Sequence, residues 1–253
     1  MLSFKHSGNA GDIIYSIPAI QSVCKEYGET AQLVLITGVR LSVVNPDRHP
    51  TGGVQLNKKM AEMLVPLLLA NEYIVNVYIT DDKDCDCDYD LDRFRRQPIN
   101  LGMGNISRWY SNIINLPIDL HEAWLHVYGQ KNDRIVIARS ERYNNPNLNY
   151  KFLSKYSPLF VGIEQEFEMM IEQIPTLEYR PVNNFYEMAQ VIKGSSLFIG
   201  NQSLPYAIAE AMKVKRVLEP CLYAGNVIPC GGLCVEAYTQ RSFEKIVSWM
   251  LNK

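Results

Sequence analysis

The chain has 253 residues, of which 47% are hydrophobic and 21% are charged, and its formal net charge is −2. This length suits one large or two small domains, and the charge excludes a dominant basic surface for nucleic acid but not a local basic groove. No apolar run reaches the roughly 18 residues that cross a bilayer, and the first residues lack the basic leader and apolar block of a signal peptide. We therefore expect a cytoplasmic protein with no membrane span.

The six cysteines are scattered along the chain, and none of them forms a C-x-x-C pair. A chain of this length does not need a disulfide framework, so we expect reduced thiols. Cys85 and Cys87 lie among aspartates, but a structural zinc site requires four well-spaced nitrogen or sulfur ligands. We predict no metal site.

Strand and helix signals alternate, which favours an α/β fold with a mostly parallel sheet. In the first half the expected strands are residues 3–5, 33–36 and 73–79, and the expected helices are 13–23, 55–70 and 105–116. Gly28 is expected to end the first helix. Aspartates alternate with less polar residues over 84–92, and this period of two predicts a solvated edge strand. A calcium loop is the alternative, but the glycine and glutamate that an EF-hand requires are missing.

A polar connection at residues 129–133 marks the expected domain boundary. We assign residues 1–129 to an N-terminal Rossmann-like domain and 130–253 to a C-terminal one. In the second half the expected strands are 134–139, 159–163, 197–200 and 216–219, and the expected helices are 184–193, 204–213 and 242–251. The last helix could also pack back on the N-terminal domain.

The loop between the first strand and the first helix carries Ser7, Gly8, Asn9 and Gly11 and ends at Asp12. Glycines allow the backbone to turn sharply and to approach a ligand, and the start of a helix offers free N–H groups. Asp12 is either a helix-terminal carboxylate, worth roughly 0.3–1 kcal/mol, or a general base at the carboxyl edge of the sheet. The residues alone do not decide between these two roles.

Two strand ends in the second half have the residue types that bind phosphate. The polar run 201–203 precedes a helix and could form a nest for a diphosphate, although an ordinary helix cap is the alternative. Arginines follow another strand and could clamp phosphate oxygens, with a solvated loop as the alternative. The candidate donor-binding residues are Arg139, Ser140, Arg142, Gly162, Asn201, Gln202 and Ser203.

These segments together resemble the GT-B glycosyltransferases of the ADP-heptose–lipopolysaccharide heptosyltransferase family, as a compact and divergent member. Residues 11–20 read GDIIYSIPAI, close to the family's first motif, G-D-x-(apolar)2-x-x-P-A-(apolar). Residues 202–209 read QSLPYAIA where the family has D-S-G-P-x-H-(apolar)-A. The serine, the proline and the last alanine match, whereas Gln202, Leu204 and Ala207 differ.

The resemblance implies two Rossmann-like domains that face each other across a cleft, with the acceptor on the first and a nucleotide-diphosphate sugar, as co-substrate, on the second. Asp12 would be the general base of an inverting, metal-independent transfer of a hexosyl or heptosyl group, with no cofactor. The helix near Ser203 and an arginine would meet the charge that develops on the leaving diphosphate. The acceptor would be a saccharide or another hydroxyl compound. Because Gln202 and Ala207 depart from the motif, we do not assume a heptose donor.

Three alternatives remain open. The altered second motif suggests a non-catalytic module that binds a nucleotide sugar or a glycan. A phage-type glycosyltransferase that acts on a modified DNA base would need a basic and aromatic groove. Arg93, Arg95, Arg96, Arg108 and Trp109 could form such a groove or only a solvated helix entrance. A Rossmann oxidoreductase is the third alternative, but the glycine fingerprint is incomplete.

Overall fold

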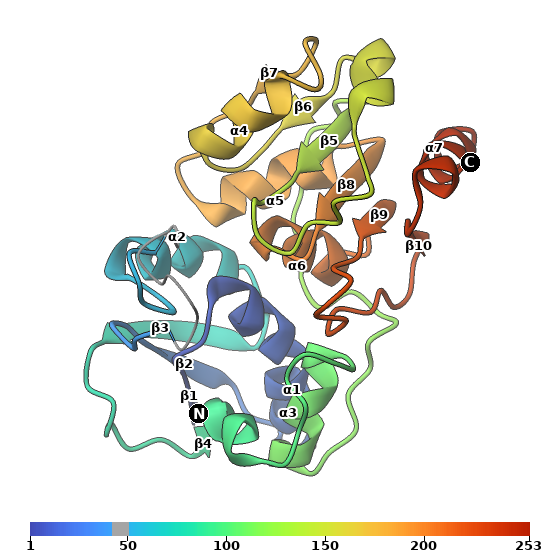
Figure 1. Cartoon of the computed structure of the whole chain (residues 1–253). Helices are drawn as coiled ribbons and strands as arrows, with labels where there is room; N and C mark the ends of the chain where they lie inside the picture. Colours follow the sequence, from blue (N-terminus) through green and yellow to red (C-terminus); the bar gives the residue numbers. More distant parts are fainter. Residues whose placement is uncertain (42–50) are drawn as a thin grey trace. The chain divides into compact units, whose positions relative to one another are not determined.

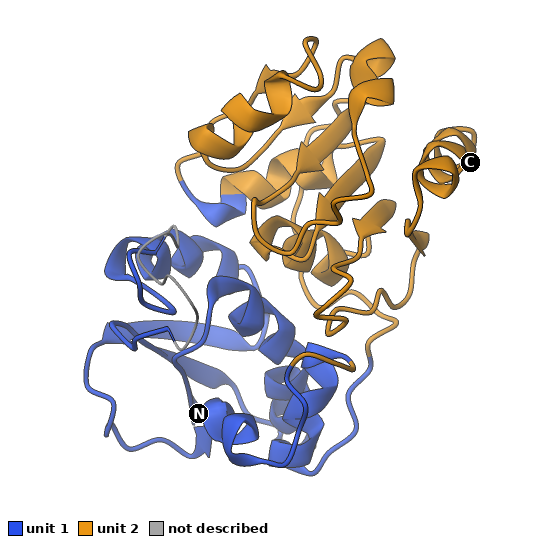
Figure 2. Ribbon diagram, viewed as in Figure 1, with its two compact units in different colours: residues 1–101, 105–119, 184–186 blue, residues 102–104, 120–183, 187–253 orange. Residues whose placement is uncertain are grey.

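The computed structural model describes residues 1–41 and 51–253, and it divides the chain into two compact units (Figures 1 and 2). Unit 1 comprises residues 1–101, 105–119 and 184–186, and unit 2 comprises 102–104, 120–183 and 187–253. The polar connection at residues 129–133 lies within unit 2. None of the helices in the described ranges is both long and apolar enough to cross a membrane.

Unit 1 is built on a four-stranded sheet with the order β3-β2-β1-β4, and all its strand pairs are parallel. The strands are β1 (Leu2–His6), β2 (Ala31–Ile36), β3 (Ile74–Thr80) and β4 (Tyr89–Asp90). The predicted first three strands are thus confirmed. Because β1 lies inside the sheet, its carboxyl end places the following loop at the edge where parallel sheets bind ligands.

The predicted edge strand over residues 84–92 is mostly wrong. Only Tyr89–Asp90 pairs with β1, although it does so at the edge of the sheet. Aspartates in and just before this range accept from other N–H groups instead: Asp90 accepts from the N–H of Asp92, and Asp82 from the N–H of Asp84, both at 3.0 Å. Asp88 accepts from both the N–H and the hydroxyl of Ser3 at 2.7 Å. Aspartate side chains that satisfy local backbone donors favour turns over a strand ladder.

The helices of unit 1 are α1 (Ala10–Tyr27), α2 (Lys58–Leu68) and α3 (Ile106–Ile114), and a short 3-10 helix, η2 (Leu91–Arg96), follows β4. Gly28 ends α1 as predicted, with a φ of 64° and its N–H bonded to the carbonyl of Cys24. The first half of α1 is almost entirely buried and packs against α3. The first turn of α1 is therefore held firmly at the end of β1.

Unit 2 is built on a six-stranded parallel sheet with the order β10-β9-β8-β5-β6-β7. The strands are β5 (Ile135–Ala138), β6 (Leu159–Phe160), β7 (Glu178–Tyr179), β8 (Leu197–Asn201), β9 (Arg216–Glu219) and β10 (Cys234–Glu236). The helices are η3 (Lys151–Tyr156), α4 (Glu164–Ile171), α5 (Phe185–Lys193, which begins in unit 1), α6 (Leu204–Ala211) and α7 (Gln240–Leu251). Strands β5, β6, β8 and β9 were predicted from the sequence, whereas β7, β10 and α4 were not.

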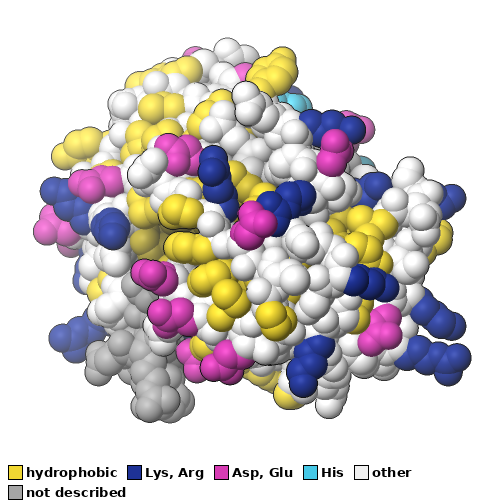
Figure 3. Space-filling view, turned by 90° about the horizontal axis from the view of Figure 1, so that it is seen from above, with side chains coloured by type: hydrophobic (Ala, Val, Ile, Leu, Met, Phe, Trp, Pro, Cys, Tyr) yellow, Lys and Arg dark blue, Asp and Glu magenta, His cyan; other side chains and the backbone are white. Residues whose placement is uncertain are grey.

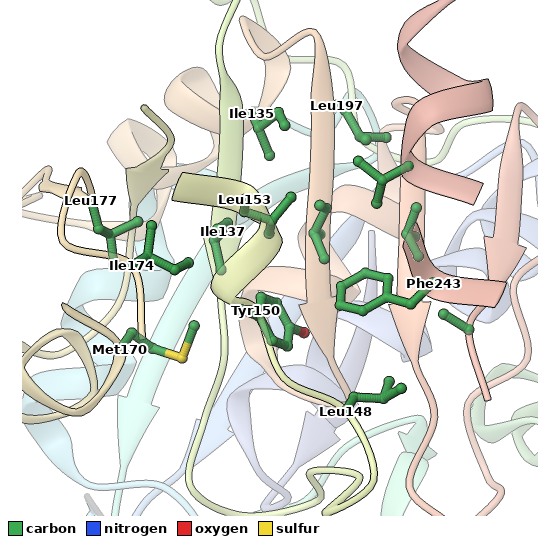
Figure 4. Close-up of a cluster of buried hydrophobic side chains, with 14 of the residues drawn as sticks. Ile135, Ile137, Leu148, Tyr150, Leu153, Met170, Ile174, Leu177, Leu197 and Phe243 are labelled. Carbon is green, nitrogen blue, oxygen red and sulfur yellow. The ribbon is translucent and has the colours of Figure 1, made fainter. Parts of the chain in front are cut away.

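The core of unit 2 includes the last helix (Figure 4). Phe243 and Val247 of α7 are fully buried with residues of β5 and β8. The ring of Phe243 meets that of Tyr150 edge to face, with centroids 5.0 Å apart. Strand β8 lies between β5 and β9, so the loops that follow these three strands gather at one edge of the sheet.

Candidate functional site

In unit 1 the loop after β1 brings Asp12 together with charged residues of η2. Asp12 is the third residue of α1, and its side chain is 21% exposed. Arg95 Nη2 donates to Asp12 Oδ2 at 3.2 Å, and Arg95 Nε donates to Asp92 Oδ1 at 3.4 Å. The guanidinium is therefore held between two carboxylates, one of which opens to solvent at the start of α1.

A series of hydrogen bonds that involve buried side chains supports this turn. The N–H of Gly8 donates to His6 Nδ1 at 2.8 Å, so the imidazole proton belongs on Nε2, which lies 2.8 Å from the Tyr110 hydroxyl. Tyr110 in turn donates to the carbonyl oxygen of Asp12 at 3.1 Å. Burial lowers the pKa of His6, although the nearby Asp92 and Asp12 act in the opposite direction. A neutral His6 thus fixes the backbone that carries Asp12.

Asp92 completes the cluster by accepting the N–H of Ser7 at 2.6 Å. Burial opposes its ionisation, but the protonated form of His6 at acid pH, the bonds from Ser7 and the charge of Arg95 together lower the pKa of Asp92. Gly8 has no room for a side chain, because a Cβ there would lie 2.5 Å from His6 Cε1 and 2.8 Å from Arg95 Nη2. Glycine at this position allows the imidazole and the guanidinium to approach the turn.

The structure thus gathers Ser7, Gly8, Asn9, Gly11 and Asp12 in one loop and first helical turn. Asn9 is the N-cap residue of α1 but makes no side-chain cap bond, and its Oδ1 is buried without a hydrogen-bond partner among the described residues. The binding roles of these residues stay predictions. Asp92 and Tyr110 were missed as neighbours of Asp12, because nothing local in the sequence joins segments 80 and more residues apart, and His6 was missed because its partner Tyr110 is equally distant.

In unit 2 Arg139 is engaged by a buried carboxylate. Its Nε and Nη2 donate to Glu219 Oε2 and Oε1 at 2.7 and 2.9 Å, and the Glu219 side chain is fully buried. Tyr150 also donates to Glu219, at 2.6 Å. Burial, as the main cause, and the charge of Glu219, as the second, raise the pKa of Tyr150 well above its usual value. The fork of Arg139 therefore ties the ends of β5 and β9 together. Of the two arginines predicted to clamp phosphate oxygens, Arg142 is the exposed one.

Asn201, at the end of β8, holds the loop that follows β5. Its Oδ1 accepts from the N–H of Ser140 at 3.0 Å, and its Nδ2 donates to the carbonyls of Ser140 and Arg142 at 2.9 and 2.7 Å. Ser203 donates to the carbonyl of Asn201 at 3.1 Å and makes no side-chain cap bond to α6. These side chains thus serve the loops around them, and the polar nest for a diphosphate stays a prediction.

Gln202 holds the loop that follows β9 in the same way. Its Oε1 accepts from the N–H of Cys221 at 2.7 Å, and its Nε2 donates to the carbonyl of Ala224 at 2.7 Å and to Asn226 at 2.9 Å. Ala207, which replaces the histidine of the family motif, is fully buried in α6. Neither departure from the motif presents a free polar side chain at the edge of the sheet.

A small pocket of about 50 Å3 opens beside the end of β5. It is lined by Arg139, Ser140, Glu141, Asn144, Glu166, Met169, Met170 and Gln173. Burial raises the pKa of Glu166 to about 7, against the effect of backbone N–H groups at Ile163 and Glu141. Gly162 lies in the turn before α4, where a Cβ would come within 2.9 Å of the Phe160 ring. A carboxyl group with a raised pKa in a pocket is typical of a binding or catalytic site.

The aromatic residue of the possible nucleic-acid groove is too buried to stack on a base. Trp109 is only 8% exposed and packs on Phe94 with ring centroids 5.4 Å apart. Arg95 is engaged by Asp12 and Asp92. Basic and acidic side chains are interspersed on the face shown in Figure 3. Among the described residues, no three His, Cys, Asp or Glu side chains gather as metal ligands.

Two α/β units, each with an all-parallel sheet and with candidate residues at its carboxyl edge, define the fold class of the GT-B glycosyltransferases. Among solved structures, the chain is similar to a glycosyl transferase family 9 protein from Veillonella parvula, with a TM-score of 0.64, 12% identity and coverage of 99% of this chain and 96% of that chain. It is similar to ADP-heptose lps heptosyltransferase II of E. coli, with a TM-score of 0.61, 11% identity and coverage of 99% and 98%.

A third similar structure is E. coli heptosyltransferase WaaC with ADP-2-deoxy-2-fluoro heptose, with a TM-score of 0.58, 8% identity and coverage of 98% of both chains. No protein-family model matches the sequence, and no curated protein does. At this level of identity the similarity establishes the fold, and it extends over nearly the whole of each chain.

Proposed function

We propose that the chain is a glycosyltransferase that moves a sugar from a nucleotide-diphosphate sugar to an acceptor hydroxyl. The observation that carries this proposal is the match of both units, over 98–99% of the chain, to glycosyltransferase structures. One of these structures is described with an ADP-sugar analogue and another with ADP. An adenine nucleotide sugar is therefore the first donor to test, together with other nucleotide sugars.

Asp12 is the proposed general base. Its partly exposed carboxylate is oriented through Oδ2 by Arg95, and we infer that Oδ1 accepts the proton of the acceptor hydroxyl. The acceptor oxygen then forms a bond to the anomeric carbon as the bond to the diphosphate oxygen breaks, and the electron pair leaves with the diphosphate. A direct displacement of this kind inverts the anomeric configuration, and we propose that groups of the chain, with no metal or cofactor, stabilise the leaving diphosphate.

The leaving diphosphate must be stabilised in unit 2. The start of α6 offers backbone N–H groups and the positive end of a helix dipole. Arg142 is exposed on the neighbouring loop, which Asn201 fixes at 2.7 Å. Both features favour an anion at the carboxyl end of β8, where electrostatic stabilisation of the leaving group contributes most.

A non-catalytic nucleotide-sugar-binding module is the second candidate. It is favoured by Gln202, which serves the loop after β9 where the family motif has an aspartate. Calorimetry that detects nucleotide-sugar binding, without transfer or donor hydrolysis over a panel of acceptors, would support this candidate over the enzyme.

Thermal shift with a panel of nucleoside diphosphates and nucleotide sugars tests the proposal. A ligand at 100 times its dissociation constant adds roughly 2.7 kcal/mol to the stability of the form that binds it. We expect at least one nucleotide sugar to raise the melting temperature, and its nucleoside diphosphate to appear when an acceptor is added in the presence of EDTA. Failure of every nucleotide and nucleotide sugar to stabilise the chain would contradict the proposal.

A further inference from the structure

Two loops at the carboxyl edge of the unit 2 sheet each carry a tyrosine, and the two rings meet. Tyr143 follows β5 and Tyr223 follows β9, on either side of β8. Their ring centroids are 6.2 Å apart, and the ring planes are inclined by 31°. The pair, which we call the tyrosine platform, borders the strand end that leads into α6.

Tyr223 lies against Tyr143 while most of its surface remains open. The residue is 74% exposed despite the contact between the two rings. The guanidinium of Arg142 lies over the other ring, 5.4 Å from the Tyr143 centroid. A large aromatic surface that is held in place but left exposed offers a ligand stacking area at a low cost in conformational entropy.

The platform is fixed by buried side chains of the motif that follows β8. Asn201 binds the carbonyl of Arg142, the residue before Tyr143, at 2.7 Å. Gln202 binds the carbonyl of Ala224, the residue after Tyr223, also at 2.7 Å. Tyr143 has a φ of 56°, which is a rare conformation for a bulky residue and is typical of functional loops.

We propose that the tyrosine platform stacks against the sugar ring of the nucleotide-diphosphate donor. This inference rests on the proposed function, which places the diphosphate at the start of α6. The transferred sugar is bonded directly to the diphosphate, whereas a ribose separates the diphosphate from the base. The weakly positive C–H face of a pyranose complements the negative face of a tyrosine ring. Arg142, stacked on Tyr143, can then reach a diphosphate oxygen.

The test compares sugar-bearing and sugar-free nucleotides by isothermal calorimetry. The ligand pairs are ADP with ADP-glucose, GDP with GDP-mannose, and UDP with UDP-glucose. For a pair that the wild-type chain binds, Tyr223→Ala should weaken the nucleotide sugar about 2- to 10-fold and leave the nucleoside diphosphate unchanged. Tyr223→Phe keeps the ring and should retain most of the affinity for the nucleotide sugar. Tyr128→Ala, at a tyrosine that is 90% exposed in the same unit, is the matched control and should change neither.

Each other outcome has a separate meaning. An equal loss for the nucleotide sugar and the diphosphate in Tyr223→Ala would place the base or the phosphates on the ring and overturn the inference. No loss for either ligand would also overturn it, while the proposed function would stand. If the wild-type chain bound none of the pairs and no member of the thermal-shift panel stabilised it, the proposed function would itself be contradicted, and this inference with it.

Discussion

Arg95 Nη2 lies 3.2 Å from Asp12 Oδ2, and 83 positions of sequence separate the two residues. Asp92 holds the same guanidinium from η2 at 3.4 Å. Because Asp92 restricts the motion of the Arg95 side chain, the guanidinium can hold the Asp12 carboxylate in one orientation. Arg95 is thus a positioning residue for the proposed base.

Removing this cation should slow turnover but not donor binding. We expect Arg95→Gln to lower kcat roughly 10- to 100-fold, because a misplaced base loses its geometry toward the acceptor. The dissociation constant of the donor should stay the same, since its proposed binding residues are in unit 2. Steady-state kinetics and calorimetry measure the two effects separately.

Arg95→Lys should restore part of the lost turnover, because it keeps the charge beside Asp12. Arg93→Gln, at an exposed arginine of the same 3-10 helix, is the matched control and should have wild-type kcat. Equal turnover in Arg95→Gln and Arg93→Gln would rule out a positioning role.

His6 should remain neutral to a lower pH than an ordinary imidazole. Burial lowers its pKa below the ordinary value of 6.5, so an NMR titration should place the protonation midpoint of its imidazole below 6.5. The unfolded chain takes up this proton first, so unit 1 should lose stability as the pH falls from 6.5 toward the folded midpoint. A midpoint at or above 6.5 would show that the bond from Gly8 to Nδ1 does not persist.

Glu166 should make unit 2 less stable at alkaline pH. Its pKa is raised from 4.5 to about 7 in the folded chain, so stability that is present below pH 4.5 is lost as the pH rises through 7. Relative to the wild type, Glu166→Gln should gain at most about 3 kcal/mol between pH 5 and pH 8. Urea denaturation measures this difference, and Glu168→Gln, at an exposed position of α4, is the control. Parallel pH curves for wild type and Glu166→Gln would contradict the prediction.

Much of the fold follows from local patterns. Runs of apolar residues predicted strands such as β2, β5 and β8, and glycine at position 28 marked the end of α1. The strand predicted over 84–92 was mostly wrong, because a period of two also fits aspartates that accept from nearby N–H groups, as Asp90 does from Asp92. Strands as short as β7 pair over two residues, too few for a periodic signal.

The site was predictable only where its residues are neighbours in sequence. The loop that ends at Asp12 could be found from its glycines and its place between a strand and a helix. His6 and Tyr110 lie 104 positions apart, and their hydrogen bond exists only because α3 packs on α1. Arg139 is the opposite case. It was predicted to clamp phosphate, but its guanidinium is bound by Glu219, a buried carboxylate 80 positions away.

The most direct test of the account is the transfer rate of Asp12→Asn, measured with a donor and an acceptor that the wild-type chain uses. The asparagine keeps the shape of the side chain but cannot accept the proton, so we predict a loss of about 100- to 10,000-fold in kcat. Donor affinity by calorimetry should remain within about twofold of the wild type, because 1.4 kcal/mol corresponds to a tenfold change and no donor contact is removed. Turnover of Asp12→Asn equal to that of the wild-type chain would contradict Asp12 as the base.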